Sequence, residues 1–232
     1  SATGELRIGV SYTRGQAVLP LLLPPFDKNH PRITISLLEG SSSELQTSLG
    51  KGMLDLLIDY APIRLDSAEV VEIGRERLFF VVPKHFMDSL YGGGAEAKRR
   101  EFASGADIAE FKELPFILLA KDDRIRRLTD RLCTQSGVRP HILLETRNIQ
   151  TAFALSMQGL GITVYPELFL TSRSILPGLP QDARSRPVDF FPIKSELTTQ
   201  TIVIARDKEC YLSNAARDFI QQAQTALDTG MH

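Results

Sequence analysis

Three short stretches of polar residues follow predicted strands and hold the side chains best suited to chemistry. They are Ser11-Tyr12-Thr13-Arg14, Ser41-Ser42-Ser43 and Thr146-Arg147-Asn148. Open α/β sheets bind ligands outside the carboxyl ends of their strands. Hydroxyls and amides at a helix N-terminus suit a small anion, because the free backbone N–H groups there carry partial positive charge. Arg14 and Arg147 add forked donors for a carboxylate. Together the loops predict an anion site, although each Ser or Asn taken singly is better explained as a helix cap.

The sequence lacks the motifs of common enzymes. It contains no GxSxG, HExxH or GxxxxGK[ST] pattern. Gly159-Leu160-Gly161 has no third glycine and precedes a predicted strand, so it favours a helix end over a dinucleotide site. The four histidines are scattered along the chain. We therefore expect no catalytic residues, no metal site and no cofactor.

A basic segment runs from Arg124 to Arg131. Its arginines surround apolar residues at helical spacing, which favours a solvated helix face over a nucleic-acid patch. Lys121-Asp122-Asp123 precedes it, at the end of a predicted strand, and is expected to face the same crevice as the polar loops.

Composition narrows the class of protein. The chain has 232 residues, with 27 Lys and Arg against 28 Asp and Glu, and a formal net charge of −1. This charge gives no footprint of nucleic-acid binding, and no apolar run reaches the roughly 20 residues of a membrane helix. Cys133 and Cys210 form no CxxC pair, which argues against zinc and disulfides and favours a cytoplasmic location. The first residues lack both an initiator Met and a signal-peptide pattern, so we expect a fragment of a longer protein.

Apolar runs bounded by turn residues predict an alternation of strands and helices. The predicted strands are 6–10, 34–38, 54–58, 78–82, 116–119, 141–144, 162–165 and 200–205, and the predicted helices include 17–28, 124–136, 149–158 and 213–227. Another helix begins at the capping box Ser41–Glu44 and ends at Gly52. Such alternation predicts a parallel sheet covered on both faces. Pro24-Pro25 predicts a kinked or broken helix, and residues 88–105 a long flexible connection.

The order of these motifs resembles the effector-binding domain of LysR-type transcriptional regulators. The resemblance rests on Leu6-Arg7-Ile8-Gly9, Leu19-Pro20, Phe26, His30-Pro31, Glu39-Gly40, Gly52-x-Leu54-Asp55-Leu56, Glu76-x-Leu78, Val82-Pro83, Leu114-Pro115-Phe116-Ile117, Gly137-Val138-x-Pro140, Glu145, Gly159-Leu160-Gly161-Ile162, Tyr165-Pro166 and Leu212-Ser213-Asn214-Ala215-Ala216-Arg217-x-Phe219. No single motif is specific, but their joint order covers nearly the whole chain.

The resemblance implies an α/β fold of two Rossmann-like subdomains similar to type 2 periplasmic binding proteins. Subdomain I would be residues 1–83 plus 200–232, and subdomain II residues 84–199, joined by crossover strands 78–83 and 200–205. A small, anionic effector would bind in the cleft between them and change their orientation. Paired cysteines of the redox-sensing branch are not matched by Cys133 and Cys210.

The resemblance also implies site residues and partners. Thr13 and Ser42 fall where relatives place ligand-binding hydroxyls, and the further candidates are Ser11, Arg14, Ser41, Lys121, Arg147, Asn148 and Thr163. The partners expected are a small-molecule effector, a second copy in a homodimer, and a tetramer of the full-length protein, with DNA held only through an N-terminal winged helix-turn-helix that this chain lacks, and no membrane. Pro24-Pro25 and the glycines at 92–94 depart from the family pattern, and the prolines leave the geometry of a dimer interface on the first helix open.

Two other classes of protein are compatible with such a fold. One is a periplasmic solute-binding protein of a transporter, which a signal peptide upstream would indicate. The other is an enzyme of a related two-lobed fold, although no catalytic constellation supports it. The effector's identity, and whether it activates or represses, are not encoded in any motif.

Overall fold

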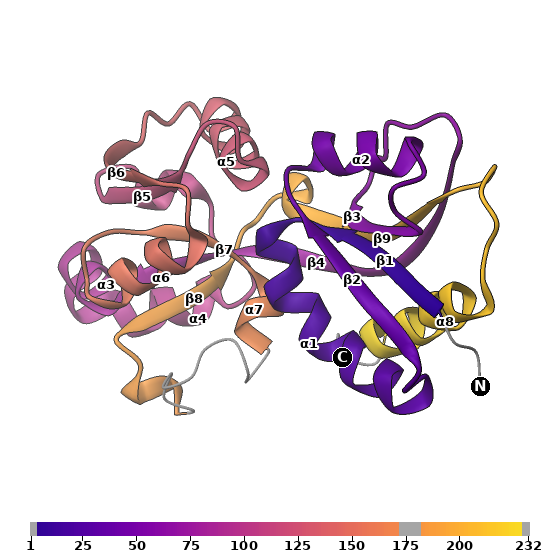
Figure 1. Ribbon diagram of the computed structural model, residues 1–232. Helices are drawn as coiled ribbons and strands as arrows, with labels where there is room; N and C mark the ends of the chain where they lie inside the picture. The colour runs from indigo at the N-terminus through magenta and orange to yellow at the C-terminus, as the bar shows by residue number, and fades with distance from the viewer. Residues whose placement is uncertain (1–3, 172–181, 229–232) are drawn as a thin grey trace. The chain divides into compact units, whose positions relative to one another are not determined.

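The computed structural model describes residues 4–171 and 182–228 (Figure 1). The chain divides into two compact units, Ser1–Glu76 with Gln200–His232, and Arg77–Thr199. Strands β4 (Ala68–Pro83) and β9 (Thr199–Asp207) carry the backbone from one unit to the other. The boundaries proposed from the sequence, at residues 83 and 200, lie on these same two strands, the first of them further along β4 than the observed division.

The first unit is built on a mixed sheet with the strand order β2-β1-β3-β9-β4. Its other elements are β1 (Gly4–Val10), α1 (Tyr12–Asn29), β2 (Ile33–Glu39), α2 (Ser42–Gly50), β3 (Leu56–Tyr60) and α8 (Asn214–Asp228). β1 is parallel to β2 and β3, and Val10 lies opposite Glu39 and Ile58. β9 is antiparallel to β3, so the sheet is not purely parallel as the alternation alone predicted. The carboxyl ends of β1, β2 and β3 share one sheet edge.

Helices cover both faces of this sheet. On one face α1 and α8 lie side by side (Figure 1), where the rings of Phe26 and Phe219 meet edge to face at 5.2 Å. On the other, α2 buries Leu45 and Leu49 against Leu57 and Ala205. Full burial of such a side chain stabilises the fold by about 1.5–3 kcal/mol. The edge strand β2 is largely exposed, because it has a neighbour on one side only.

Helix α1 differs from its prediction. It begins at Tyr12, before the predicted start at residue 17, and continues to Asn29 without a break. The earlier start has a local cause, because the Ser11 side chain accepts a hydrogen bond from the backbone N–H of Arg14. Pro20, Pro24 and Pro25 all lie on its exposed side, where water can satisfy the carbonyls that a proline leaves without a donor.

The second unit contains two small sets of strands. β5 (Pro115–Leu119) and β6 (His141–Thr146) are parallel, with Leu119 opposite Thr146, and the second half of β4 pairs antiparallel with β7 (Thr163–Pro166) and β8 (Val188–Pro192). The helices are α3 (Lys84–Tyr91), α4 (Ala95–Phe102), α5 (Arg124–Gln135), α6 (Ile149–Met157) and α7 (Glu167–Thr171). Four 3₁₀ turns are Gly92–Gly94, Ile108–Phe111, Ala183–Ser185 and Glu196–Thr198.

The predicted flexible connection over residues 88–105 is wrong. The segment forms the end of α3, the 3₁₀ turn Gly92–Gly94 and helix α4. Helix α4 buries only Ala95 and Phe102, an apolar signal too sparse to stand out among its charges. Arg99 of this helix forms ion pairs with Asp189 at 2.7 Å and with Asp88 at 2.9 Å, both outside the helix.

None of the helices in the described ranges is both long enough and apolar enough to cross a membrane. No group of three or more His, Cys, Asp or Glu side chains in those ranges is placed to hold a metal ion. Cys133 and Cys210 are both free thiols, the first buried and the second exposed.

Candidate functional site

In the first unit, two helices begin at the sheet edge where β1, β2 and β3 end. Ser11 caps α1, and Ser41 caps α2 with a reciprocal pair of bonds. The Ser41 side chain accepts from the backbone N–H of Glu44, whose carboxylate accepts from the Ser41 backbone N–H at 2.9 Å. Both helices direct the positive end of their dipole toward this edge. Ser11 and Ser41 therefore act as caps, which was the alternative weighed for each of them.

Thr13 and Ser42 stand in the first turns of these helices. The half-buried Thr13 hydroxyl makes no hydrogen bond with any of the residues that the structure describes. The exposed Ser42 hydroxyl donates to Asp59 of β3 and accepts from the side-chain amide of Gln46 at 2.9 Å. Asp59 itself is buried. Within the described residues the Thr13 hydroxyl is thus available to bind a ligand. The Ser42 hydroxyl, by contrast, is held by its hydrogen bond to Asp59 at the end of β3.

Arg14 is occupied by the protein itself. Its side chain is 1% exposed, pairs with the equally buried Glu76 of β4, and lies over the Tyr60 ring with 4.2 Å between the guanidinium carbon and the ring centroid. The Tyr60 hydroxyl donates to the same carboxylate. This burial departs from the prediction that Arg14 presents a forked contact to a ligand. A buried guanidinium needs a carboxylate partner, and the partner comes from a distant strand.

In the second unit, the corresponding edge follows β5 and β6. Lys121 is exposed in the loop after β5, and its amine has no partner among residues 4–171 and 182–228. Asn148 caps α6 by accepting from the backbone N–H groups of Gln150 at 2.9 Å and Thr151 at 3.3 Å. Arg147 donates to Asp122 at 2.8 Å, and this hydrogen bond and charge lower the pKa of the Asp122 carboxyl. Lys121 is thus a cation at this edge that forms no ion pair with the described residues.

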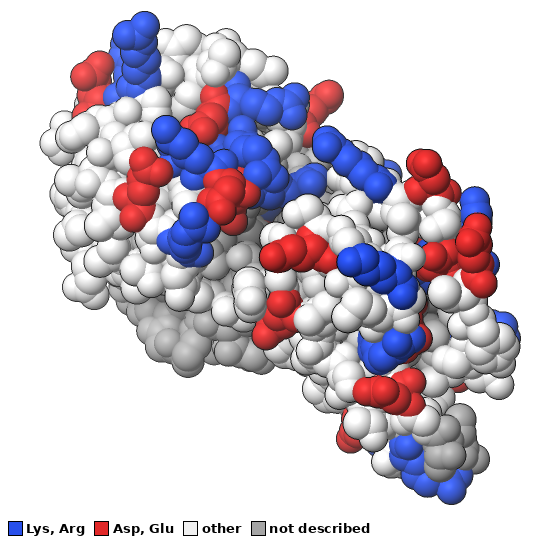
Figure 2. Space-filling view, turned by 45° about the horizontal axis from the view of Figure 1, so that its top comes forward, with Lys and Arg blue, Asp and Glu red and all other residues white. Residues whose placement is uncertain are grey.

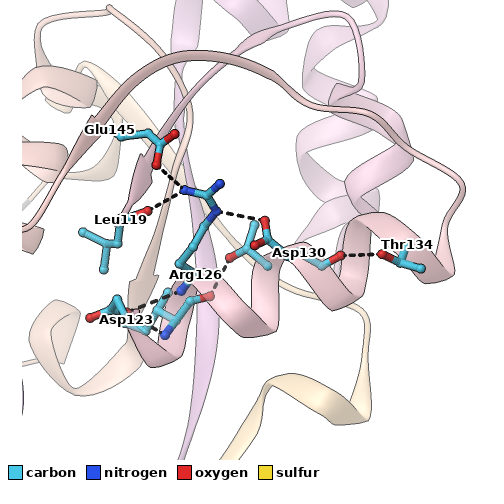
Figure 3. A network of polar contacts seen from close by, with 8 residues as sticks. Leu119, Asp123, Arg126, Asp130, Thr134 and Glu145 are labelled. Carbon is cyan, nitrogen blue, oxygen red and sulfur yellow. Dashed lines mark hydrogen bonds and ion pairs between the residues drawn. The ribbon is translucent and has the colours of Figure 1, made fainter. Parts of the chain in front are cut away.

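The Arg126 side chain holds this loop in place through hydrogen bonds (Figure 3). It is 3% exposed and donates to the Leu119 carbonyl at 2.7 Å, to Glu145 at 2.7 Å and to Asp130 at 2.9 Å. These bonds tie the start of α5 to the ends of β5 and β6. Asp123 caps the same helix by accepting from the Ile125 backbone N–H at 2.7 Å, and burial raises the pKa of the Asp123 carboxyl. The loop that carries Lys121 is therefore held at both of its ends.

The basic segment of α5 is only partly the solvated face that was predicted. Arg127 and Arg131 are exposed, but Arg126 is buried in the network described above. Figure 2 shows acidic and basic side chains intermixed over the face in view. Neither sign of charge covers that face alone.

Thr163 lies away from solvent. It is 1% exposed in β7, opposite Val81 of β4. This placement departs from its prediction as a ligand contact. The structure thus leaves Thr13, Ser42 and Lys121 with exposed or unused polar atoms at the strand edges, while Arg14 and Thr163 are enclosed.

Sequence reasoning missed Asp59, Glu76 and Arg126 as organisers of the two edges. One signal was available, since Asp59 is the single charged residue in the apolar strand Leu56–Tyr60. Arg126 and Glu76 gave no comparable signal, because both stand in segments with several other charges.

Comparisons with known proteins agree on one family. The family model described as "LysR substrate binding domain" matches residues 1–228. Among curated relatives, the uncharacterized HTH-type transcriptional regulators YwbI and YcgK of Bacillus subtilis (strain 168) are 28% and 26% identical over 225 and 231 residues. The alignments cover 97% and 96% of this chain and 67% of each relative. The chain thus spans about two thirds of their length.

Solved structures show the same fold. The C-terminal domain of a probable LysR family transcriptional regulator from Rhodococcus sp. RHA1 superposes with a TM-score of 0.75 at 24% identity, covering 96% of this chain and 99% of that one. The effector binding domain of QuiR in complex with shikimate gives 0.72 at 20% identity, covering 98% and 99%. Neither the family model nor these matches support the alternative of a periplasmic solute-binding protein.

Proposed function

The chain belongs to the LysR substrate-binding domain family, and from that premise we propose that it senses a small anionic effector on behalf of a transcriptional regulator. The observation that carries the choice of an anion is the strand edge of the first unit, where α1 and α2 both begin. A helix N-terminus attracts an anion by about 0.3–1 kcal/mol, and by more where the site is partly buried.

In this proposal Thr13 and Ser42 are the principal contacts. The Thr13 hydroxyl has no competing partner within the described part of the chain, so it donates to the ligand without losing an internal bond. The Ser42 hydroxyl is oriented by Asp59 and Gln46. A hydrogen bond to a charged group is worth about 1.5–3 kcal/mol. The Thr13 bond favours a carboxylate over an uncharged analogue of the same shape, whereas a bond from Ser42 to the carboxylate replaces the one that its single proton makes to Asp59.

Lys121 supplies the positive charge of the second unit's edge. Arg147 and Asn148 stay candidates, although each already serves the protein, as the partner of Asp122 and as the cap of α6. The QuiR domain, whose fold is similar to that of this chain, was solved in complex with shikimate, which is a hydroxylated carboxylate. That chemistry supports the choice of a carboxylate here.

Calorimetric titration of the chain against a panel of small carboxylates tests the proposal. Thr13→Ala should weaken the binding of any carboxylate that scores by about tenfold or more. Thr47→Ala is the matched control, because the exposed Thr47 hydroxyl bonds only within α2, to the Ser43 carbonyl. Binding that is equally strong in Thr13→Ala and Thr47→Ala would remove the proposed contact.

A variant in the second unit tests whether one effector draws on both units. Lys121→Gln should weaken the binding of the carboxylate whose binding Thr13→Ala also weakens. If only the variants of the first unit matter, the second edge has no part in binding. Turnover of the carboxylate is not expected, since the chain's relatives are transcriptional regulators.

We further propose that the chain forms a homodimer through its first unit. Leu37 and Leu38 of the edge strand β2 are 45% and 39% exposed, and Leu21 of α1 is 37% exposed. Exposed apolar side chains on an unpaired sheet edge favour association. Sedimentation should show a dimer that Leu38→Lys disrupts, whereas an unchanged dimer in that variant would place the interface elsewhere.

The remaining partners concern the longer protein. A tetramer that binds DNA through an upstream helix-turn-helix, in the cytoplasm, is the proposal for the full-length regulator. Its support is that the matched relatives are called HTH-type regulators and extend beyond the aligned part. Electrophoretic mobility shift with and without the upstream region would test this.

A further inference from the structure

The first unit has a hollow at the end of the sheet opposite to Thr13 and Ser42. β9 runs antiparallel to β3, with Tyr60 opposite Ile202 and Leu57 opposite Ala205. Arg206 therefore lies near the amino end of β3, whereas the proposed effector contacts lie near its carboxyl end. Around Arg206 the protein encloses a hollow of about 390 Å³. This volume is within the range of about 300–1,000 Å³ that small-molecule sites occupy.

The hollow exists because α8 covers only part of the sheet. Its apolar stripe, Ala216, Phe219 and Ala223, is buried, and Gln222 ties the helix to α1 by donating to the Leu22 carbonyl at 2.7 Å. The helix is thereby drawn toward α1. Between this helix and the part of the sheet formed by β9 and the start of β4 lies the hollow, whose floor residue Ile204 is 1% exposed.

Each wall of the hollow presents one periodic face. From α8 come Arg217, Ile220, Gln221 and Gln224, whose spacing of three, four and seven residues places them on one side of a helix. From the strands come Glu69 with Val71, and Ile204 with Arg206, each pair two residues apart and so on one face of the sheet. The floor is aliphatic, and the polar groups stand around it.

The charges of the hollow sum to one positive charge. Arg206 is 19% exposed, pairs with Glu69 and donates to the carbonyls of Asp207 at 3.3 Å and Cys210 at 3.5 Å. Its guanidinium is therefore held in place before any ligand arrives. The Arg217 side chain makes no ion pair or hydrogen bond with the part of the chain that the structure describes. Arg217 is thus the uncompensated charge.

We propose that this hollow is a second small-molecule site, for a monocarboxylate with an apolar body. The carboxylate pairs with Arg217, and the apolar body covers the half-buried Val71 and Ile220. An arginine fork matches a carboxylate in geometry and charge. The site is separate from the proposed effector site, because its residues lie at the other end of the strands.

Octanoate is a suitable probe, and 1-octanol, which has the same chain length without the charge, is its control. In ¹⁵N-labelled protein, octanoate should shift the backbone resonances of Arg217, Gln221 and Gln224, and 1-octanol should bind about tenfold more weakly or not at all. Equal binding of both compounds would show an apolar groove without anion recognition and would overturn the proposal.

Variants place the binding on one edge of the sheet. Arg217→Gln and Ile220→Glu should each weaken octanoate binding by about tenfold or more, while Arg131→Gln, at an exposed arginine of α5, and Thr47→Ala, whose hydroxyl bonds to the Ser43 carbonyl within α2, should leave it unchanged. Two variants guard against simple misfolding, and circular dichroism of each checks its fold. Octanoate binding that survives Arg217→Gln, or is lost in Arg131→Gln or Thr47→Ala, overturns the second site. Shifts of the same resonances with protein concentration alone would show that another copy covers the hollow and would overturn it too.

Discussion

Glu76→Gln tests the buried pair that joins α1 to β4. The side chains of Arg14 and Glu76 are each 1% exposed, so the substitution leaves the Arg14 charge in the interior without its carboxylate. Removal of one partner of a buried ion pair costs about 3–5 kcal/mol. For a chain of this size each kcal/mol corresponds to a shift of about 2–4 °C in Tm, so we expect a loss of about 6–20 °C. Because the chain contains no Trp, far-ultraviolet circular dichroism is the appropriate probe.

Two further variants identify the cause of this loss. Asp122→Asn breaks the surface ion pair between Asp122, which is 66% exposed, and Arg147, which is 79% exposed. It should change the free energy of unfolding by no more than about 1 kcal/mol. Arg14→Met combined with Glu76→Leu removes both charges, and should recover most of the stability that Glu76→Gln loses. A Tm for Glu76→Gln within about 3 °C of the wild type would refute the reasoning, as would a double variant less stable than the single one.

Three further predictions concern local structure. Ser41→Ala removes the cap of α2 and should cost about 0.5–2 kcal/mol in urea unfolding, whereas no change would show that the capping box adds nothing. Leu49→Ala leaves a cavity in the fully buried cluster under α2 and should cost about 2–5 kcal/mol in the same assay, with the exposed Leu38→Ala as the mild comparison. Burial raises the pKa of the Cys133 thiol to about 11, so at pH 8 it is protonated and a thiol reagent should modify the exposed Cys210 alone. Fast labelling that persists in Cys210→Ser would contradict this.

Local signals in the sequence predicted several elements well. The capping box of α2 was predictable because Ser41 and Glu44 are three residues apart and each side chain accepts from the backbone N–H of the other residue. Helix α1 was predicted too short, since its first turn carries polar residues and no apolar stripe. Helix α4 was missed because only Ala95 and Phe102 are buried in it.

The candidate site was predicted in part. The polar loops at strand ends are visible in the sequence, because each follows an apolar run and precedes a helix. The hydrogen bonds and ion pairs that their side chains make cannot be predicted from the sequence. Asn148 caps α6, as the interpretation of a single Asn as a helix cap predicted, whereas nothing in the sequence indicated that Arg147 pairs with Asp122.

Thr13 and Arg14 show where sequence information ends. By itself the sequence determined the family, through the order of its motifs, and the strand edge on which both residues stand. Only the tertiary structure decided that Arg14 is enclosed against Glu76 while the neighbouring Thr13 hydroxyl has no hydrogen-bond partner among residues 4–171 and 182–228. The physical reason is that a buried charge requires an opposite charge, and that charge arrives from a strand 62 residues away along the chain.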